Sequence, residues 1–411
     1  RIAEVLNRVI EKAWRGSAPA QINIPRDFWT KVIDIEMPQI INLKHPGGDP
    51  DAIERAAAIL SEAEFPVILN GVGVILAGGI DASRVLAERL DAPVCCNYQH
   101  NDAFPGSHPL SVGPLGYNGS KAAMQLISNA DVVLALGNRL NPYSTMPGYQ
   151  YDYWPKNAKV IQVDINGDRI GLVKRVAVGI QGDARLVAEQ LVSKLSPTAG
   201  DKGRQERKAL IASTKSRWLQ ELSSMESESD DEGITWNARA RERDPNRMSP
   251  RQAWKAIMAA MPQDAIISTD IGNNCAIGNA YPTFEKGRKY LAPGMFGPCG
   301  YGLPAILGAK IGCPDTPCIG FAGDGAFGIS MNELTACGRN DWPPITMVVF
   351  RNYQWGAEKR NTTLWFEDNF VGTELNVGVN YAKVADGCGL KGVQANTPEE
   401  LTEMLQTAVK E

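Results

Sequence analysis

An aspartate and an asparagine, each placed after an apolar run, form the candidate functional pair of this sequence. Asp324 follows the run of residues 318–322, and Asn352 follows the run of residues 347–350, 28 residues after Asp324. If both runs are strands of one parallel sheet, the carboxylate and the amide meet at its carboxyl edge. Both are hard oxygen ligands, suited to Mg²⁺ or Ca²⁺ and unsuited to zinc. The pair predicts a divalent-cation site.

The residues next to Asp324 add a candidate site for a phosphate. Asp324 stands between two glycines, and a loop of mostly small residues, 325–328, precedes a helix that we expect over residues 330–340. Backbone N–H groups and the helix dipole at such a terminus favour an anion. The unit therefore reads strand–loop–helix–strand, with a metal ligand and a diphosphate cradle at one strand end.

Three further segments favour a ligand site over a chance turn. Asp270 ends an earlier predicted strand, the glycine-rich residues 297–304 open a helix, and residues 353–356 form another turn after Asn352. All of these segments, together with Asp324, should reach the carboxyl edge of one sheet, where ligands bind in open α/β folds.

Bulk composition is that of a globular protein of two or three domains. The chain has 411 residues, 44% of them apolar and 21% charged. A net charge of −4 and a pI near 5.7 argue against a broad nucleic-acid surface. No apolar run approaches the ~20 residues of a membrane span. The eight cysteines are scattered without a C-x-x-C pair, which favours reduced thiols in a cytoplasmic protein.

The elements that must position these residues alternate between helix and strand. Helices are predicted over residues 52–63, 81–90 and 120–128, and strands over residues 66–70, 93–96, 131–136 and 160–165. Such alternation predicts a parallel sheet with helices on both faces. A second block of the same style begins after Ser249 and Pro250, the expected N-cap and first turn of a helix. The fold class is α/β, with two doubly wound parallel-sheet domains.

The segments outside these blocks have a different character. Residues 2–14 predict an amphipathic helix and residues 20–24 a strand, before a connector over residues 31–50. This beginning reads as the tail of a domain whose body lies upstream, so we expect the chain to be part of a longer protein. Residues 196–247 are rich in charge and predict a solvated linker, partly helical around residues 217–219.

Two other features favour structural interpretations. Gly71 and Gly73, with Gly78, do not form G-x-G-x-x-G, and no acid follows at the expected place, so a tight strand-to-helix turn is favoured over a nucleotide loop. His100 and His108 lie in a loop rich in Pro, Asn and Gly. Such histidines are expected to be hydrogen-bonding surface residues.

Taken together, the Gly-Asp-Gly and Asn motif resembles that of the thiamine-diphosphate enzyme superfamily, which includes acetolactate synthase and pyruvate decarboxylase. The resemblance covers nearly the whole chain. It implies that residues 1–30 are the end of a pyrimidine-binding domain, residues 45–195 a central domain and residues 248–411 a diphosphate-binding domain, with residues 196–247 as linker.

Within that superfamily, residues 297–301, 354–359 and 370–375 are similar to the sulfoacetaldehyde acetyltransferases. This likeness implies an acyltransferase of sulfonate metabolism, as in taurine degradation, that converts sulfoacetaldehyde and phosphate to acetyl phosphate and sulfite. Three alternatives stay open: an acetolactate-synthase-like carboligase, a 2-oxoacid decarboxylase, and, from another class, a nucleotide-binding regulatory module that holds ADP or flavin.

The resemblance also implies roles for individual residues. Mg²⁺ would be bound by the side chains of Asp324 and Asn352 and by the carbonyl of Gln354. Phosphate oxygens would be held by backbone amides of Gly325, Ala326, Trp355 and Gly356. Further cofactor-binding residues would be Asp270 at its strand end, Cys299 as the bulk that bends the cofactor, and Gly297 as an acceptor for its amino group. Lys359 and Arg360 are either cations near a substrate sulfonate or a solvated basic pair.

What the family needs beyond these residues is expected outside the chain. The glutamate that activates the cofactor belongs upstream of Arg1, so no catalytic residue is assigned here, and this chain alone is predicted to bind cofactor weakly without turnover. Because family sites form between subunits, a homodimer or homotetramer is implied. The residues leave open whether flavin occupies the central domain.

Overall fold

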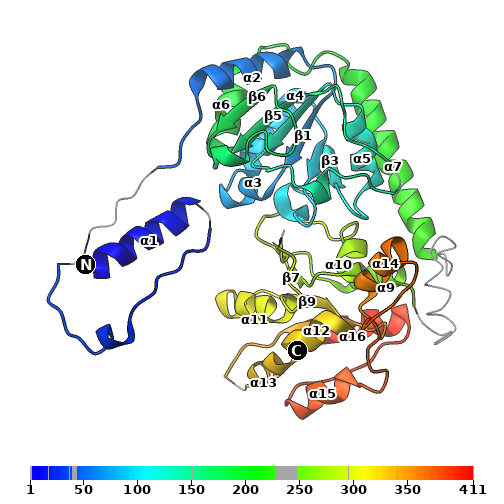
Figure 1. The fold of residues 1–411 in the computed structure, drawn as a ribbon. Coiled ribbons are helices and arrows are strands. Elements are labelled where there is room, and N and C mark those ends of the chain that lie inside the picture. Colours follow the sequence, from blue (N-terminus) through cyan, green and yellow to red (C-terminus); the bar gives the residue numbers. More distant parts are fainter. Residues whose placement is uncertain are drawn as a thin grey trace. The chain divides into compact units, whose positions relative to one another are not determined.

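The computed structural model describes residues 2–16, 18–36, 38, 44–149, 151–227, 248–294, 296–339 and 341–410. Its chain divides into two compact units, residues 1–47 and residues 48–411, which are described separately. The second unit contains both predicted α/β blocks (Figure 1).

The first unit is a helix followed by extended chain. Helix α1 (Ile2–Gly16) is the amphipathic helix that the sequence predicts, and none of its side chains is buried. A single 3₁₀ turn, η1 (Arg26–Phe28), follows. The predicted strand over residues 20–24 is wrong, because the described residues provide no neighbouring strand to pair with it. The assignment of residues 1–30 to a pyrimidine-binding domain stays a prediction.

A six-stranded parallel sheet forms the core of the central block, in the order β3-β2-β1-β4-β5-β6. Its strands are β1 (Pro66–Asn70), β2 (Val94–Cys96), β3 (Ser111–Pro114), β4 (Val132–Leu136), β5 (Lys159–Asp164) and β6 (Val178–Gln181). The order reverses between β1 and β4, which is the switch point where open α/β sheets bind ligands. Four of these strands were predicted; β3 and β6 were missed.

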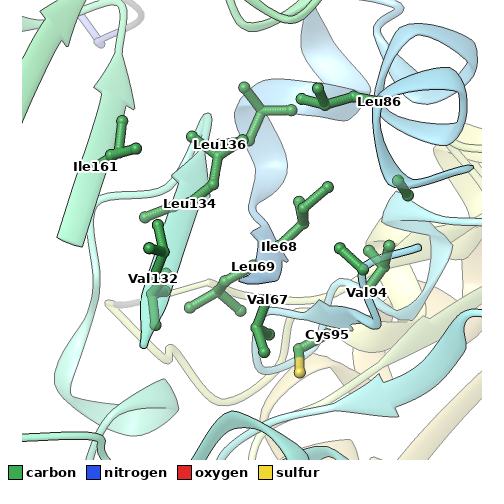
Figure 2. Packing of buried hydrophobic residues seen from close by; sticks show 14 of the residues in the cluster. Val67, Ile68, Leu69, Leu86, Val94, Cys95, Val132, Leu134, Leu136 and Ile161 are labelled. Carbon is green, nitrogen blue, oxygen red and sulfur yellow. The ribbon is translucent and has the colours of Figure 1, made fainter. Parts of the chain in front are cut away.

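Helices cover both faces of this sheet. They are α2 (Pro50–Glu62), α3 (Val72–Leu76), α4 (Ile80–Leu90), α5 (Lys121–Ser128) and α6 (Ala184–Lys194). Asp49, Ser120 and Asp183 cap α2, α5 and α6 by accepting backbone N–H groups. Figure 2 shows how side chains of β1, β2, β4, β5 and α4 pack in one apolar core. Burial on both faces explains why β1 and β4 read as unbroken apolar runs.

The charged segment after the central block is more ordered than predicted. Its first half forms α7 (Arg204–Ser227), the long green helix beside α5 in Figure 1. Trp218 and Leu222 are buried, and so is Arg207. The Arg207 guanidinium donates hydrogen bonds to the backbone carbonyls of Glu64, Leu90, Asp91, Gly200 and Lys202. The prediction of a solvated linker is therefore wrong for α7; residues 228–247 lie outside the described part of the chain.

The second block is a four-stranded parallel sheet in the order β10-β9-β7-β8. Its strands are β7 (Ile266–Thr269), β8 (Tyr290–Leu291), β9 (Cys318–Gly323) and β10 (Thr346–Phe350). Alternate residues of β9 and β10 join different clusters. Phe321 and Val348 pack with α9 (Pro250–Ala260) and α16 (Pro398–Lys410) on one face. Ala322 and Val349 pack on the other face with α11 (Gly302–Gly312), α12 (Asp324–Ser330), α13 (Leu334–Cys337) and α15 (Tyr381–Gly387). The α/β class with two doubly wound parallel sheets is confirmed.

Local signals in this block behave mostly as expected. Ser249 caps α9, and Gln252 completes a capping box with it. The helix predicted over residues 330–340 instead begins at Asp324 as α12 and continues through the 3₁₀ turn η5 (Met331–Glu333) into α13. Two glycines inside α12 hid it, because glycine has low helix propensity. Among the described residues, every helix is too short or too polar to cross a membrane.

Side chains that follow β2 join the two sheets. The Asn101 amide donates to the carbonyls of Asn279 and Pro282, each at 2.9 Å. The Asp102 carboxylate accepts the N–H groups of Lys289 at 3.0 Å and Tyr290 at 3.2 Å. The loop after β2 is thereby attached to backbone at both ends of the segment that leads into β8.

Candidate functional site

The strand ends singled out in the sequence do meet at one sheet edge. Strands β7, β9 and β10 are parallel neighbours, so Asp270, Asp324 and Asn352 all follow adjacent strands at the carboxyl edge. Helix α11, opened by the glycine-rich segment, packs against β7 and β9. The structure therefore brings together the segments on which the predicted site depends.

Asp324 connects the ends of β9 and β10. One of its oxygens, Oδ2, accepts the N–H groups of Tyr353 at 2.7 Å and Asn352 at 3.2 Å, and Oδ1 accepts that of Gly325 at 3.1 Å. The side chain is buried, and this burial raises the pKa of Asp324 above its ordinary value of 3.8, against the opposing effect of these donors. Its buried negative charge is balanced by amide dipoles alone within the described residues, an arrangement that favours a cation.

The turn after Asn352 is fixed by a distant segment. Tyr353 has a φ of +61°, and the Asn352 Oδ1 accepts the Gln354 N–H at 3.2 Å. Gln354 forms an antiparallel bridge with Glu374, and the Trp355 N–H donates to the Thr373 carbonyl at 2.8 Å. Residues 353–355 thus pair with residues 373–375.

This pairing corrects one predicted contact. The Trp355 amide was expected to hold a phosphate oxygen, but that N–H is already engaged by the Thr373 carbonyl. The indole of Trp355 instead packs against Gly325, where an added Cβ would lie 2.9 Å from the ring. Trp355 therefore contacts the turn that carries Gly325 through its ring.

Gly356 leaves room beside two amide side chains. A Cβ at Gly356 would lie 2.8 Å from Nδ2 of Asn352 and 3.0 Å from Nδ2 of Asn273. The Nδ2 of Asn273 is buried and has no hydrogen-bond partner among the described residues. A buried amide donor without an acceptor is costly unless a ligand supplies one. The predicted site residues Asn352 and Gly356 therefore lie together, beside a donor that suits an anion.

Asn273 was missed by the sequence analysis. It is the first residue of α10 (Asn273–Gly278), four residues after Thr269, the last residue of β7. The available signal was a pair of amides, Asn273 and Asn274, directly after a predicted strand end. A helix that starts at a strand end places such side chains at the ligand-binding edge.

Asp270 holds the glycine-rich loop. The fully buried carboxylate accepts the Ile271 and Gly300 N–H groups with Oδ1, each at 3.0 Å, and the Gly302 N–H with Oδ2 at 2.7 Å. Gly297, in the same loop, has a φ of +60°, in the left-handed region that glycine adopts readily. These bonds give Asp270 a positioning role, and direct contact with a cofactor stays a prediction for both Asp270 and Gly297.

Cys299 is a partly buried thiol between two carboxylates. Burial, followed by the charges of Asp270 and Glu358, raises the pKa of the Cys299 thiol above 9.0. A protonated thiol is a poor nucleophile at neutral pH. The geometry therefore favours a steric role over nucleophilic chemistry.

The central sheet carries a separate pocket at its switch point. It is lined by loops after β1, β2 and β4, and by Gly294 from the second block, and includes His100 and Arg139. Gly71 lies so close to the neighbouring loop that a Cβ would fall 2.3 Å from the Gly137 carbonyl oxygen. This close approach supports the structural interpretation of the Gly-Val-Gly turn.

The two histidines differ from one another. His108 interacts with Glu88 at 3.2 Å and accepts the Leu110 N–H, as expected of a hydrogen-bonding surface residue. His100 instead lines the pocket, and burial, with a smaller contribution from Arg139, lowers its pKa to about 4. The prediction of a hydrogen-bonding surface residue therefore describes His100 less well than His108, because His100 is partly exposed but lines a pocket.

Two family models match the two blocks. Residues 53–191 match the thiamine pyrophosphate enzyme central domain, and residues 270–411 match the thiamine pyrophosphate enzyme C-terminal TPP binding domain. The chain belongs to the thiamine pyrophosphate enzyme family. Thiamine pyrophosphate is another name for thiamine diphosphate, so the predicted superfamily is confirmed.

Curated relatives of this thiamine pyrophosphate enzyme align along the whole chain. It is 72% identical over 411 residues to a probable sulfoacetaldehyde acetyltransferase of Rhizobium meliloti (strain 1021), covering 100% of this chain and 70% of that protein. It is 71% identical over 411 residues to a sulfoacetaldehyde acetyltransferase of Roseovarius nubinhibens, covering 100% of this chain and 68% of that protein. A probable acetolactate synthase large subunit of Methanocaldococcus jannaschii is 29% identical, over 99% of this chain and 67% of that protein. The chain thus spans about 70% of the length of its more similar relatives.

The candidate cofactor-site residues and the switch-point pocket fall mainly in different matched domains of the thiamine pyrophosphate enzyme family. Asp324, Asn352, Asn273 and Gly356 all lie in the TPP binding domain, and most of the pocket lining lies in the central domain. The predicted cofactor site and the switch-point pocket are therefore separate features of two domains.

Proposed function

We propose that this thiamine pyrophosphate enzyme is a Mg²⁺-dependent acetyltransferase that converts sulfoacetaldehyde and phosphate to acetyl phosphate and sulfite. The observation that carries the proposal is the identity of 71–72% to proteins of that name across the whole chain, against 29% to an acetolactate synthase subunit. The site supports it further, because residues 354–359 and 370–375, two of the stretches singled out in the sequence, interact with each other.

Mg²⁺ would be held by Asp324, Asn352 and the carbonyl of Gln354. The buried carboxylate of Asp324 suits a hard cation by charge. The Oδ1 atoms of Asp324 and Asn352 each accept only one hydrogen bond from described residues, from Gly325 and Gln354 respectively, so each keeps a lone pair for a metal. The donor set is thus of the right chemistry for magnesium.

The diphosphate would be held at the same edge of the sheet, by groups that donate N–H hydrogen bonds. Asn273 contributes a buried amide N–H₂ that lacks an acceptor among the described residues, and Gly325, Ala326 and Gly356 contribute backbone amides near the starts of α12 and α14 (Gly356–Trp365). The glycines keep side chains away from this surface, as the short Cβ distances at Gly325 and Gly356 indicate. The residues present therefore fit a magnesium diphosphate group.

When bound, thiamine diphosphate supplies the carbanion that the reaction requires. The protein's part is to orient it. The loop that Asp270 anchors presents Gly297 and Cys299, one as a carbonyl acceptor and the other as bulk. The activating glutamate stays a prediction for sequence upstream of Arg1, and a second copy of the chain is proposed to complete the site as a homodimer or homotetramer.

The proposal is tested by measuring sulfite. Protein that carries this chain is supplied with thiamine diphosphate and Mg²⁺, then with sulfoacetaldehyde and phosphate, and sulfite and acetyl phosphate are quantified. Equal amounts of the two products are expected. Pyruvate consumption without sulfite release would instead support a carboligase or decarboxylase. Tighter binding of ADP or FAD than of thiamine diphosphate at the Asp324 edge would support the regulatory module.

A further inference from the structure

The two adjacent cations of α14 have different surroundings. Lys359 forms an ion pair with Glu374, and its Nζ lies 4.8 Å from the centre of the Phe370 ring. Its side chain is only 13% exposed. Its charge is therefore already balanced by a carboxylate, and it gains little by binding a further anion.

Arg360, in contrast, has no carboxylate partner within the described residues. Its guanidinium carbon lies 4.8 Å from the centre of the Tyr117 ring, a cation–π contact across two domains. Partial burial lowers the pKa of Arg360, yet a guanidinium stays charged in proteins. The structure thus contains a partly desolvated positive charge whose five N–H donors have no protein acceptor among the described residues.

The position of Arg360 relates it to the proposed site. It lies one helical turn after Gly356, and residues four apart share one face of a helix. Gly356 touches the side chains of Asn352 and Asn273. Tyr117 follows β3, in a loop that approaches α10, because a Cβ at Gly119 would lie 3.1 Å from Nδ2 of Asn279. Arg360 therefore lies on the helix that begins at the carboxyl edge of the second sheet, and it contacts a loop that follows a strand of the central sheet.

We propose that Arg360 binds a tetrahedral oxyanion of a substrate, either the sulfonate of the aldehyde or the phosphate acceptor, while Tyr117 fixes the plane of its guanidinium. This assignment rests on the proposed function, in which both substrates carry such a group. The planar fork of an arginine donates two parallel hydrogen bonds to an oxyanion, which a lysine ammonium cannot do. Stacking on Tyr117 restricts the rotamers of Arg360 before the anion arrives, so less entropy is lost on binding.

The test measures binding of two probes to protein loaded with thiamine diphosphate and Mg²⁺. Calorimetry gives the dissociation constants of 2-hydroxyethanesulfonate, an unreactive sulfonate, and of inorganic phosphate. Arg360→Gln is expected to weaken one of the two at least tenfold, the scale of a lost charged hydrogen-bond pair. Arg360→Lys should weaken the same probe by a smaller factor, and Tyr117→Leu by a few-fold.

A matched control separates this role from a general effect of charge. Arg339 also lies over an aromatic ring, that of Trp342 at 5.3 Å, but it is exposed and paired with Asp341 before β10 begins, at the opposite edge of the sheet. Arg339→Gln should leave both probes unchanged. Affinity for thiamine diphosphate should also stay unchanged in Arg360→Gln, which a merely structural defect would not allow. If Arg360→Gln does not fold, Arg360→Lys carries the same comparison.

The outcomes show which substrate supplies the anion. They also separate a failure of the role of Arg360 from a failure of the proposed function. Loss of 2-hydroxyethanesulfonate binding with a raised KM for sulfoacetaldehyde assigns Arg360 to the sulfonate, and loss of phosphate binding with a raised KM for phosphate assigns it to the acceptor. Both probes binding Arg360→Gln as they bind the wild type would overturn the role of Arg360, even if the wild type releases sulfite. A wild type that folds, binds cofactor and releases no sulfite would contradict the proposed function instead.

Discussion

The two parallel sheets use the same architecture for different purposes. Every residue of β1 and β4 in the central sheet is buried, whereas every residue of β10 in the second sheet is only partly buried. The central sheet has six strands around one large core, and the second has four strands between smaller clusters. The central sheet is thus the better packed, while the edge of the second sheet carries the polar groups of the proposed site.

Glycines show the same contrast. Gly71 and Gly73 in the central domain pack against the backbone of Gly137, so their absent side chains allow two loops to touch. Gly356 and Gly325 in the second domain face the side chains of Asn352, Asn273 and Trp355 instead. A glycine-rich turn at a strand end therefore either lets two loops pack closely or leaves space beside other side chains. The group that faces the glycine Cα, backbone or side chain, distinguishes the two cases.

The most discriminating test of this comparison replaces one strand-end aspartate in each sheet by alanine. Asp324→Ala is expected to weaken thiamine diphosphate binding about a hundredfold and to abolish its dependence on Mg²⁺, because the proposed metal ligand is removed, a change of about 2.7 kcal/mol. Asp164 is its counterpart, a buried carboxylate at the end of β5. Asp164→Ala should leave cofactor affinity unchanged in the same calorimetric titration. Equal effects of the two variants would contradict the metal assignment.

A second pair of variants tests how the sheets differ in packing. Val133 of β4 is fully buried, and Val348 of β10 is partly buried. Val133→Ala should lower the free energy of unfolding by about 2 kcal/mol, through lost burial and a residual cavity, and Val348→Ala by about 1 kcal/mol. Urea denaturation followed by circular dichroism measures both. A larger loss at Val348 would reverse the assignment of the main core.

A third prediction concerns pH and the central domain. The pKa of His100 is lowered from 6.5 to about 4, so the folded state stays neutral while the unfolded state takes up a proton. The folding stability that depends on neutral His100 is therefore fully present above pH 6.5 and is lost as the pH falls toward 4. Between pH 7 and 4.5 the wild type should lose about 2 kcal/mol more stability than His100→Asn. Parallel urea titrations of both proteins test this, and identical slopes would refute it.

Local patterns predicted most of the fold and the centre of the site. Buried parallel strands such as β1, β4, β9 and β10 are continuous apolar runs, and the polar residues that follow them must lie at one edge. That reasoning placed Asp324 and Asn352 correctly. It could not reveal that the Trp355 amide is taken by Thr373, because that pairing joins segments far apart in the chain.

Amino-acid composition was misleading for the elements that were predicted wrongly. In α7 the many charged residues suggested a solvated linker, although its buried positions, 207, 211, 214, 218 and 222, follow helical spacing. Arg207 is a charged residue, and in the structure its guanidinium donates hydrogen bonds to backbone carbonyls. Residues 20–24 show the opposite failure, because a strand-like sequence forms no strand without a partner.

The hydrogen bonds that Asn101 donates and Asp102 accepts, with backbone groups of residues 279–290, limit how the enzyme can move. Swinging one domain away from the other would break these four bonds together, and three of them are buried and therefore expensive to leave unmade. A clamshell opening of the two sheets is therefore costly, and local rearrangement of short segments is the less costly way for a ligand to reach the interior. Turnover in such an enzyme would be gated by a few residues, and engineering its substrate access means redesigning loops while leaving the hinge-free junction intact.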